Sequence, residues 1–307
     1  MNFDVIIIGG GAAGLSAALW CDELGLSALL LESGAEFGGQ LLWTYNEIKN
    51  HLGIEAKNGR ELRDIFIRQT ENRKFTYRLN AEILEVDLDK KKVLLKTSES
   101  FSARALIIAT GIRRRKLNVE GEETFRNKGI IESGKRDAEF VKGKSALIVG
   151  GGDAAFENAL ILSETASTVT LAYRGKDFRA RAEFIEQVKN HPKVKILTET
   201  IVREINGKEQ VEAVKLENLK TGETYNFPVE AILLRIGVEP NTEFLGGKLD
   251  LDEKGYIKIN SFCQTSVKGI YAVGDVANPL APTVSSAVGM GATAVKTITN
   301  YELRMTN

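Results

Sequence analysis

Short apolar runs, each followed by a glycine-rich turn, dominate the hydrophobic pattern of the chain. The first run, Val5 to Ile8, has the length of a buried parallel strand and leads into glycines at positions 9, 11 and 14. Beyond them, apolar residues recur at helical spacing, at Leu15, Ala18 and Leu19. The pattern predicts a strand, a tight turn and a helix in direct succession.

The spacing Gly-x-Gly-x-x-Gly in this turn is typical of a dinucleotide site. Gly9 permits the tight turn, Gly11 lets a pyrophosphate approach the backbone, and Gly14 lets the helix and strand pack closely. The phosphates then bind the free N–H groups at the helix N-terminus. A second apolar run, 28–31, ends in Glu32, near where an acid binds a ribose hydroxyl. Together these features predict a first nucleotide-binding unit.

The same pattern occurs a second time. A strand at 146–149 is followed by Gly150, Gly152, Ala155 and a helix. The next strand, STVTLAY, ends without a carboxylate, and the segment RGKDFRARA follows it, with Arg174 and Arg179. Arginines here suit the 2′-phosphate of NADP, whereas an acid would suit NAD. We therefore expect NADPH, with NADH possible, and an ordinary solvated charge run is the alternative.

Further buried strands place the second unit inside the first. ALIIATG at 105–111 and GIYAVGD at 269–275 lie on either side of the second nucleotide segment, and Asp275 could bind a polyol hydroxyl. AILLRIG at 231–237 has the matching place in the second unit. We predict an α/β fold of two Rossmann-like, three-layer ββα domains, with the NAD(P) domain inserted in the FAD domain. The expected limits are 1–112 with 243–307 for FAD and 113–242 for NAD(P)H.

Composition narrows the function classes. The 307 residues contain 41 Lys and Arg and 41 Asp and Glu, so no basic field attracts nucleic acid or acidic lipid. No apolar run approaches the ~20 residues of a membrane span. The start, MNFDVIIIGGG, lacks a charged leader region, and the two cysteines are far apart without a metal-binding pattern. We expect a cytoplasmic protein with no metal site.

At this point the chain resembles the low-molecular-weight thioredoxin reductase family over essentially its whole length. The segments that carry the likeness are IIIGGGAAG, FGGQL, IIATG, GGGDAA, IGVEPNT, GYIKIN and YAVGDVAN. The resemblance implies FAD, a nicotinamide nucleotide and a homodimer. The residues expected around FAD are Gly9, Gly11, Ala12, Ala13, Gly14, Glu32, Gly39, Gln40, Asn50, Thr110, Gly111, Gly274, Asp275 and Thr283. Those expected around NADP are Gly150, Gly152, Asp153, Ala155, Arg174, Arg179, Ile236 and Gly237.

The main departure from the family concerns its redox cysteines. Where family members have Cys-Ala-Thr-Cys-Asp, this chain reads Ser133, Gly134, Lys135, Arg136 and Asp137. Only the aspartate, the proton donor to the dithiol in the family, matches. Cys21 and Cys263 lie elsewhere and are expected to be buried thiols. We infer that dithiol chemistry is not available within the chain.

The resulting hypothesis is an FAD-dependent NAD(P)H oxidoreductase that passes electrons to a non-dithiol acceptor. A small molecule, oxygen or an acidic electron-carrier protein could accept them, and the chain also resembles thioredoxin-reductase-like ferredoxin or flavodoxin–NADP reductases. Other readings are a disulfide reductase that uses a partner's cysteines, and a flavin-binding protein without turnover. The segment RRRK at 113–116 could dock a carrier or bond to its own surroundings. His51 could supply a proton near the flavin, and Trp43 could flank it.

Overall fold

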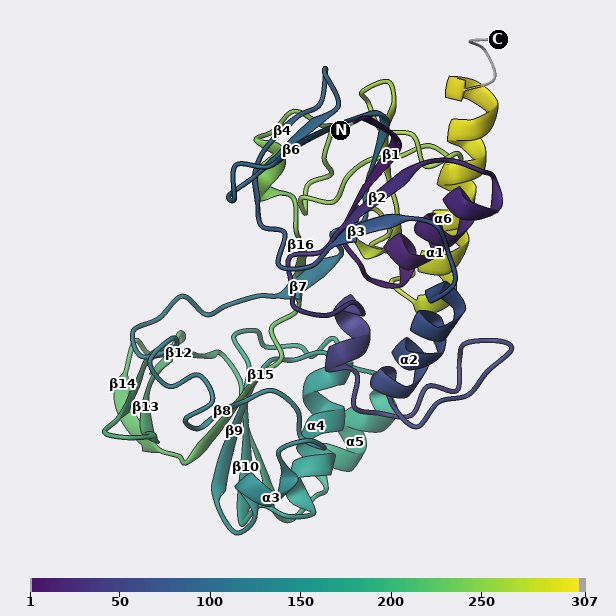
Figure 1. The fold of residues 1–307 in the computed structure, drawn as a ribbon. Helices are drawn as coiled ribbons and strands as arrows, with labels where there is room; N and C mark the ends of the chain where they lie inside the picture. The colour runs from purple at the N-terminus through teal and green to yellow at the C-terminus, as the bar shows by residue number, and fades with distance from the viewer. Residues whose placement is uncertain (1, 304–307) are drawn as a thin grey trace. The chain divides into compact units, whose positions relative to one another are not determined.

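The computed structural model describes residues 2–303 and separates into two compact units (Figure 1). Unit 1 comprises Met1–Arg113 and Glu239–Asn307, and unit 2 comprises Arg114–Val238. The chain passes between them in β7 (Ile112–Arg114) and β16 (Val238–Pro240), two short strands that pair with each other. The division differs from the expected limits by one residue at the first crossing and by four at the second, because the strand pair itself carries both crossings.

Unit 1 is built on a mostly parallel sheet. Its strand order is β3-β2-β1-β6-β5-β4, and β17 also pairs with β6. The strands are β1 (Asn2–Ile8), β2 (Ala28–Leu31), β3 (Thr76–Arg78), β4 (Ile83–Asp87), β5 (Lys92–Leu95), β6 (Ser100–Ile108) and β17 (Ile270–Ala272). The helices are α1 (Ala12–Glu23), α2 (Gly59–Thr70) and α6 (Val284–Ile298), with short helical turns at Gly39–Trp43, Glu243–Leu245, Gly274–Val276 and Thr299–Leu303.

Alternation along β1 gives unit 1 its layers. Val5 and Ile7 point into a core shared with α1 and α6, whereas Ile6 and Ile8 point into a second core shared with β4 and β5. All four side chains are buried, so both faces of this strand are covered. The run of four apolar residues is therefore required by two cores at once.

Unit 2 repeats this plan. Its parallel sheet has the order β11-β10-β9-β15-β8, and an antiparallel sheet has the order β12-β13-β14. The strands are β8 (Ile130–Ile131), β9 (Ser145–Val149), β10 (Thr168–Ala172), β11 (Val194–Leu197), β12 (Thr200–Gly207), β13 (Val211–Asn218), β14 (Thr224–Pro228) and β15 (Ala231–Leu234). The helices are α3 (Ala138–Val141), α4 (Asp153–Ser163) and α5 (Ala182–Lys189).

The central strand of unit 2 also serves two cores. Ala146 and Ile148 of β9 pack with α4 and α5, and Leu147 and Val149 pack with the antiparallel sheet. In both units a helix layer and a second β layer thus enclose one parallel sheet. No helix within residues 2–303 is long and apolar enough to cross a membrane.

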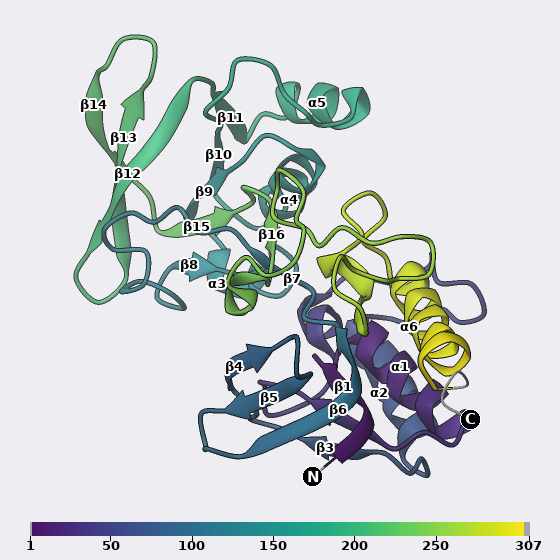
Figure 2. The same ribbon diagram turned by 90° about the horizontal axis from the view of Figure 1, so that it is seen from above.

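Helices α1 and α6 lie side by side in both ribbon views (Figure 2). Gly291 lies where they meet, since a Cβ there would be 2.6 Å from the carbonyl oxygen of Ala13 and 2.9 Å from Cβ of Ser16. Gly289, two residues earlier in α6, is exposed and has no atom within 4 Å of such a Cβ. Close helix packing therefore explains one of these glycines and not the other.

Alanine at these two positions is expected to have opposite effects on stability. Gly291→Ala overpacks the helix contact and should lower the free energy of unfolding by about 1–3 kcal/mol. Gly289→Ala adds helix propensity at an open position and should raise it by about 0.5–1 kcal/mol. Denaturant unfolding followed by circular dichroism measures both, and equal effects of the two changes would contradict the packing described.

Candidate functional site

A cavity of about 640 Å³ opens in unit 1 beside the carboxyl ends of its parallel strands. Ligands of open α/β sheets bind at this edge, and the volume is in the range of small-molecule sites. Most of the residues expected around FAD line it: Gly9, Gly11, Ala12, Ala13, Glu32, Gly39, Gln40, Thr110, Gly111, Gly274, Asp275 and Thr283.

The glycine-rich turn delivers the start of α1 to this cavity. Gly9 has a φ of +109°, and a Cβ there would be 2.3 Å from the carbonyl oxygen of Ala109. Gly14 is packed more closely still, because its Cβ would be 1.9 Å from the carbonyl oxygen of Gly9. Gly14 thus sets the contact of helix and strand and does not line the cavity, in keeping with the role expected for it.

Gly11 leaves the end of α1 open to a ligand. As the N-cap residue it has no side chain to accept a hydrogen bond from the first helical N–H groups. A Cβ at Gly11 would have only Cα of Gly39 nearby, at 3.9 Å. Free N–H groups facing open space at a helix N-terminus suit an anionic group such as a pyrophosphate.

Two carboxylates face the cavity in different ways. Glu32 is fixed by the backbone N–H groups of Gly10 and Gly34, each 2.7 Å from one of its oxygens. Oε1 also accepts from the hydroxyl of Ser33 at 3.3 Å, whereas Oε2 retains a lone pair for a ligand hydroxyl. Asp275 has no hydrogen-bond or ion-pair partner within the part of the chain that the structure describes, and burial raises its pKa. A half-buried carboxyl without a partner is suited to accept hydrogen bonds from a polyol.

The segments IATG (108–111) and EPNT (239–242), two of those that carry the resemblance, are hydrogen-bonded to each other at the cavity. Thr110 Oγ1 donates to the carbonyl oxygen of Asn241 at 2.8 Å, and Asn241 Nδ2 donates to the carbonyl oxygen of Thr110 at 2.8 Å. Both residues line the cavity. Asn241 was not among the expected site residues, because the partner that gives it a role lies far away in the sequence.

Besides Gly14, two expected residues, Asn50 and His51, fall outside the lining of this cavity. Asn50 is exposed in the loop before α2. His51 places Nδ1 3.0 Å from Ser285 Oγ and its ring edge-on to Phe66, which ties this loop to the start of α6. The hydroxyl of Thr283 is used as the N-cap of α6, where it accepts from the N–H of Ser286 at 3.2 Å.

Trp43, which the sequence suggested could flank the flavin, lines the cavity while 51% exposed, so this side chain is not part of a core. The cavity also contains two residues that no motif indicated. Lys96 and Glu82, an ion pair at 2.5 Å, come from the region of the β4–β5 hairpin. The hairpin has no sequence signature of a cofactor site, and only the fold brings it to the cavity.

The second glycine-rich turn connects β9 to α4 in unit 2. Gly150 has a φ of +152°, and a Cβ there would be 2.2 Å from the carbonyl oxygen of Arg235. Gly152 is the N-cap of α4 and has no atom within 4 Å of its Cβ position. Ala155 is buried where the first unit has Gly14. The turn therefore repeats the open helix N-terminus found in unit 1.

The segment after β10 lies against this turn. The N–H of Arg179 donates to the carbonyl oxygen of Gly151 at 2.8 Å, and Arg174 and Arg179 have exposed side chains. Neither forms an ion pair with another described residue. Arg181, in contrast, pairs with Asp153, with Nε 3.0 Å from Oδ2, so the acid in the first turn of α4 is neutralised. Ile236 and Gly237 follow β15, and the carbonyl of Gly237 accepts from the N–H of Arg115 at 3.1 Å.

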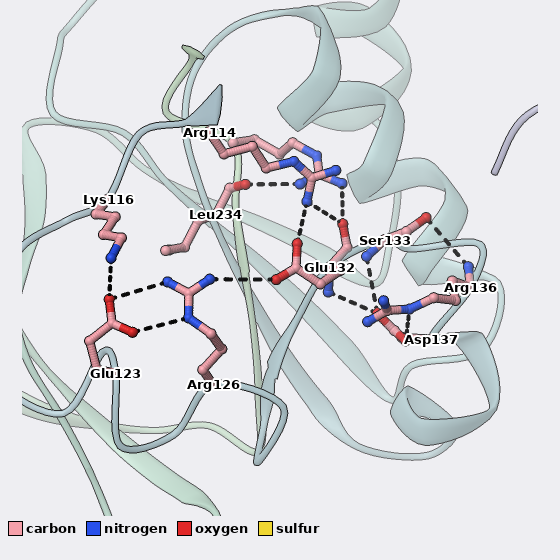
Figure 3. A network of polar contacts seen from close by, with 10 residues as sticks. Arg114, Lys116, Glu123, Arg126, Glu132, Ser133, Arg136, Asp137 and Leu234 are labelled. Carbon is pink, nitrogen blue, oxygen red and sulfur yellow. Dashed lines mark hydrogen bonds and ion pairs between the residues drawn. The ribbon is translucent and has the colours of Figure 1, made fainter. Parts of the chain in front are cut away.

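The turn at 132–137, where the resemblance implies a cysteine pair, is stabilised by hydrogen bonds and ion pairs (Figure 3). Asp137 accepts from the N–H groups of Glu132 and Ser133 at 2.8 and 3.0 Å and pairs with Arg136 at 2.6 Å. Burial opposes its ionisation, but the bonds from Arg136, Ser133 and Glu132 together hold the pKa of Asp137 below its usual value. This arrangement favours a structural role for Asp137 over that of a proton donor.

Both cysteines are free thiols in the apolar core of unit 1. Burial raises the pKa of Cys21 to about 12 and that of Cys263 to about 11. Thiolates are the reactive form, so neither side chain is poised for exchange at neutral pH. Within the described residues no group of three or more His, Cys, Asp or Glu is placed to hold a metal ion.

The basic segment 113–116 bonds to its own surroundings. Arg113 pairs with Glu239 and Glu243 in unit 1. In unit 2, Arg114 pairs with Glu132, Arg115 donates to the carbonyl oxygen of Val238, and Lys116 pairs with Glu123. These contacts favour the alternative in which the segment bonds to its own surroundings and does not dock an electron carrier.

Comparisons with known proteins give consistent results. The family model for pyridine nucleotide-disulphide oxidoreductases matches residues 3–291. A thioredoxin reductase of Mycolicibacterium smegmatis is 34% identical over 95% of this chain and 94% of its own. A 34.2 kDa protein in a rubredoxin operon of Clostridium pasteurianum is 29% identical over 98% and 97%. The crystal structure of Lactococcus lactis thioredoxin reductase superimposes with a TM-score of 0.84 at 31% identity, over 98% and 99%. The predicted fold class and the resemblance are confirmed.

The charged turn leads to a pH-dependent prediction. Asp137→Asn should lower the free energy of unfolding at pH 7 by about 1–3 kcal/mol, since bonds to a charged acceptor are lost. Because the folded pKa is lowered, this stabilisation is present above the unfolded pKa of about 3.9 and is lost as pH falls through the folded pKa. Unfolding measured from pH 7 to pH 3 should show the two proteins converging. Glu139→Gln, whose carboxylate is 88% exposed, is the control and should change little.

Proposed function

The chain belongs to the pyridine nucleotide-disulphide oxidoreductase family, and within it we propose an FAD-dependent NAD(P)H oxidoreductase whose electron acceptor is not a dithiol. The observation that carries the proposal is the state of the thiols. The chain has two cysteines, both are buried with raised pKa values, and the turn at 132–137 contains charges instead. The machinery that binds nucleotides is retained in both units.

The residues of unit 1 fit FAD. The open N-terminus of α1 at Gly11 would hold the pyrophosphate, Glu32 the adenosine ribose, and Asp275 the polyol chain. Bound FAD would accept a hydride from the nicotinamide and pass the electrons to the acceptor. The protein needs no acid or base for this transfer and contributes binding and orientation. Neither Asp137 nor His51 is required as a proton donor.

The residues of unit 2 fit a nicotinamide nucleotide. Gly152 leaves room for a pyrophosphate at the start of α4, while Gly150 and Ala155 shape the turn. Arg174 and Arg179 are exposed and unpaired among described residues, which suits the 2′-phosphate of NADPH. NADH is then the weaker donor. The enzyme is proposed to act as a homodimer, as the resemblance implies, and in the cytoplasm.

A carrier protein is the second candidate for the acceptor. The resemblance to thioredoxin-reductase-like ferredoxin or flavodoxin–NADP reductases supports this candidate, and the relative from Clostridium pasteurianum is named as a protein in a rubredoxin operon. The ion pairs of segment 113–116 argue against that segment as the docking site. A disulfide reductase that uses a partner's cysteines could receive its electrons from a thiol partner or ferredoxin. A flavin-binding protein without turnover would pass on no electrons.

Gly152→Asp separates the nucleotide site from the flavin site. Its carboxylate would occupy the phosphate position, while Asp is a favourable N-cap, so the fold should be kept. We expect NADPH to bleach the flavin absorbance of the wild type anaerobically, at lower concentration than NADH. The variant should need at least tenfold more NADPH.

Two further measurements on Gly152→Asp serve as controls. Its flavin content and its reduction by dithionite should equal those of the wild type, because unit 1 is unchanged. Normal reduction of Gly152→Asp by NADPH would mean that the nucleotide does not bind at this turn.

A further inference from the structure

Two guanidinium groups converge on one main-chain oxygen at the end of β8. Arg114 Nη1 donates to the carbonyl oxygen of Glu132 at 2.6 Å, and Arg235 Nη2 donates to the same oxygen at 2.9 Å. Arg114 is the last residue of β7, and Arg235 follows β15. A carbonyl oxygen carries only a partial charge and neutralises neither guanidinium group, and of these two arginines only Arg114 pairs with the carboxylate of Glu132.

The nearby carboxylates are used by other groups. The carboxylate of Glu132 pairs with Arg114 at 2.8 Å and lies 3.9 Å from Arg126, as Figure 3 shows. Asp137 is held by Arg136 and by two backbone N–H groups. Within residues 2–303 no carboxylate oxygen lies within 4.0 Å of Arg235.

Arg235 consequently has donors to spare. Besides the oxygen of Glu132, its side chain donates to the carbonyl oxygen of Leu234 at 2.9 Å, and both acceptors are neutral. A guanidinium carries five N–H donors, so others remain without a protein acceptor in the described chain. Burial, together with the positive charge of Arg114, lowers the pKa of Arg235 to about 10. The more distant carboxylates of Glu132, Glu157 and Asp137 act on this pKa in the opposite direction. A half-buried cation without a carboxylate in direct contact among the described residues is costly, and a bound anion would offset that cost.

The position is one where ligands bind in this class of fold. The N–H of Arg235 donates to the carbonyl oxygen of Val149 at 2.8 Å, and its own carbonyl oxygen is packed on Gly150. The side chain therefore starts from the carboxyl edge of the parallel sheet, next to the glycine-rich turn. The side chain of Arg114 is 38% exposed, so the pair can be reached from solvent.

We propose that Arg114 and Arg235 bind one oxyanionic group, a carboxylate or a phosphate, of a small-molecule ligand. Guanidinium groups match the planar, two-oxygen geometry of such anions. The two arginines meet at the carbonyl oxygen of Glu132, in the turn at 132–137. The ligand is assigned a binding site here and no part in the electron transfer of the proposed function.

The test is calorimetric titration of the oxidised holoenzyme with inorganic phosphate and, separately, with malonate. Ionic strength is held constant with chloride. The protein carries Gly152→Asp, so that the pyrophosphate cradle of α4 does not contribute. We expect saturable binding of at least one probe, and the preferred probe identifies the group as phosphate or carboxylate.

Arg235→Met should weaken this binding at least tenfold, because it removes the charge and keeps the length of the side chain. Arg203→Met is the matched control, since Arg203 is an exposed arginine of unit 2 paired with Glu217, and it should leave binding unchanged. Arg114→Met should weaken binding in the same way. This second variant keeps the test valid if Arg235→Met does not fold.

The proposed site is wrong if binding survives both Arg235→Met and Arg114→Met, or if neither probe binds. Arg235 would then only stabilise the structure, through its hydrogen bond from the end of β15 to the end of β8. The titration uses oxidised protein and needs no turnover. Failure of the proposed function would appear separately, as a wild-type flavin that NADPH does not reduce.

Discussion

The close approach of Gly14 to the carbonyl oxygen of Gly9 is the contact on which unit 1 depends. It allows α1 to begin directly at the end of β1, so that the first N–H groups of the helix face the cavity and not the sheet. A side chain at Gly14 would separate helix and strand and move that end away. Unit 2 has Ala155 at the corresponding position, and its Gly150 is packed on the carbonyl oxygen of Arg235.

This constraint keeps the two glycine-rich turns independent of the turn at 132–137. The two nucleotide turns are fixed by packing inside each unit, through β1 and α1 in one and β9 and α4 in the other. The turn at 132–137 contributes no side chain of a large core, and its Asp137 is satisfied locally by Arg136 and two backbone N–H groups. The residues of this turn can therefore differ without altering the packing of either glycine-rich turn.

Local patterns made the nucleotide turns predictable. Gly9, Gly11 and Gly14 act on neighbours within one strand and one helix, so their spacing is enough to give their roles. Asn50 and His51 were expected near the flavin without a local spacing rule, and the bond that ties their loop to the start of α6 through Ser285 could not be read from the sequence. Residues close together in sequence can also diverge: Arg113 and Arg114 are adjacent, but their carboxylate partners lie in different units.

Long-range convergence was not predictable. The contact of Thr110 with Asn241, the placement of Lys96 at the cavity, and the meeting of Arg114 with Arg235 each join segments separated by a whole domain or a hairpin. No spacing rule within one segment encodes such pairs. They depend on the sheet order, which brings β8 beside β15 and pairs β7 with β16.

The most direct measurement of the central claim is the number of electrons that the protein takes up per flavin. An anaerobic dithionite titration, followed by flavin absorbance, should reach full reduction at two electrons per FAD if, as proposed, the flavin is the only redox group. Four electrons per FAD would reveal a redox-active disulfide and would contradict the account.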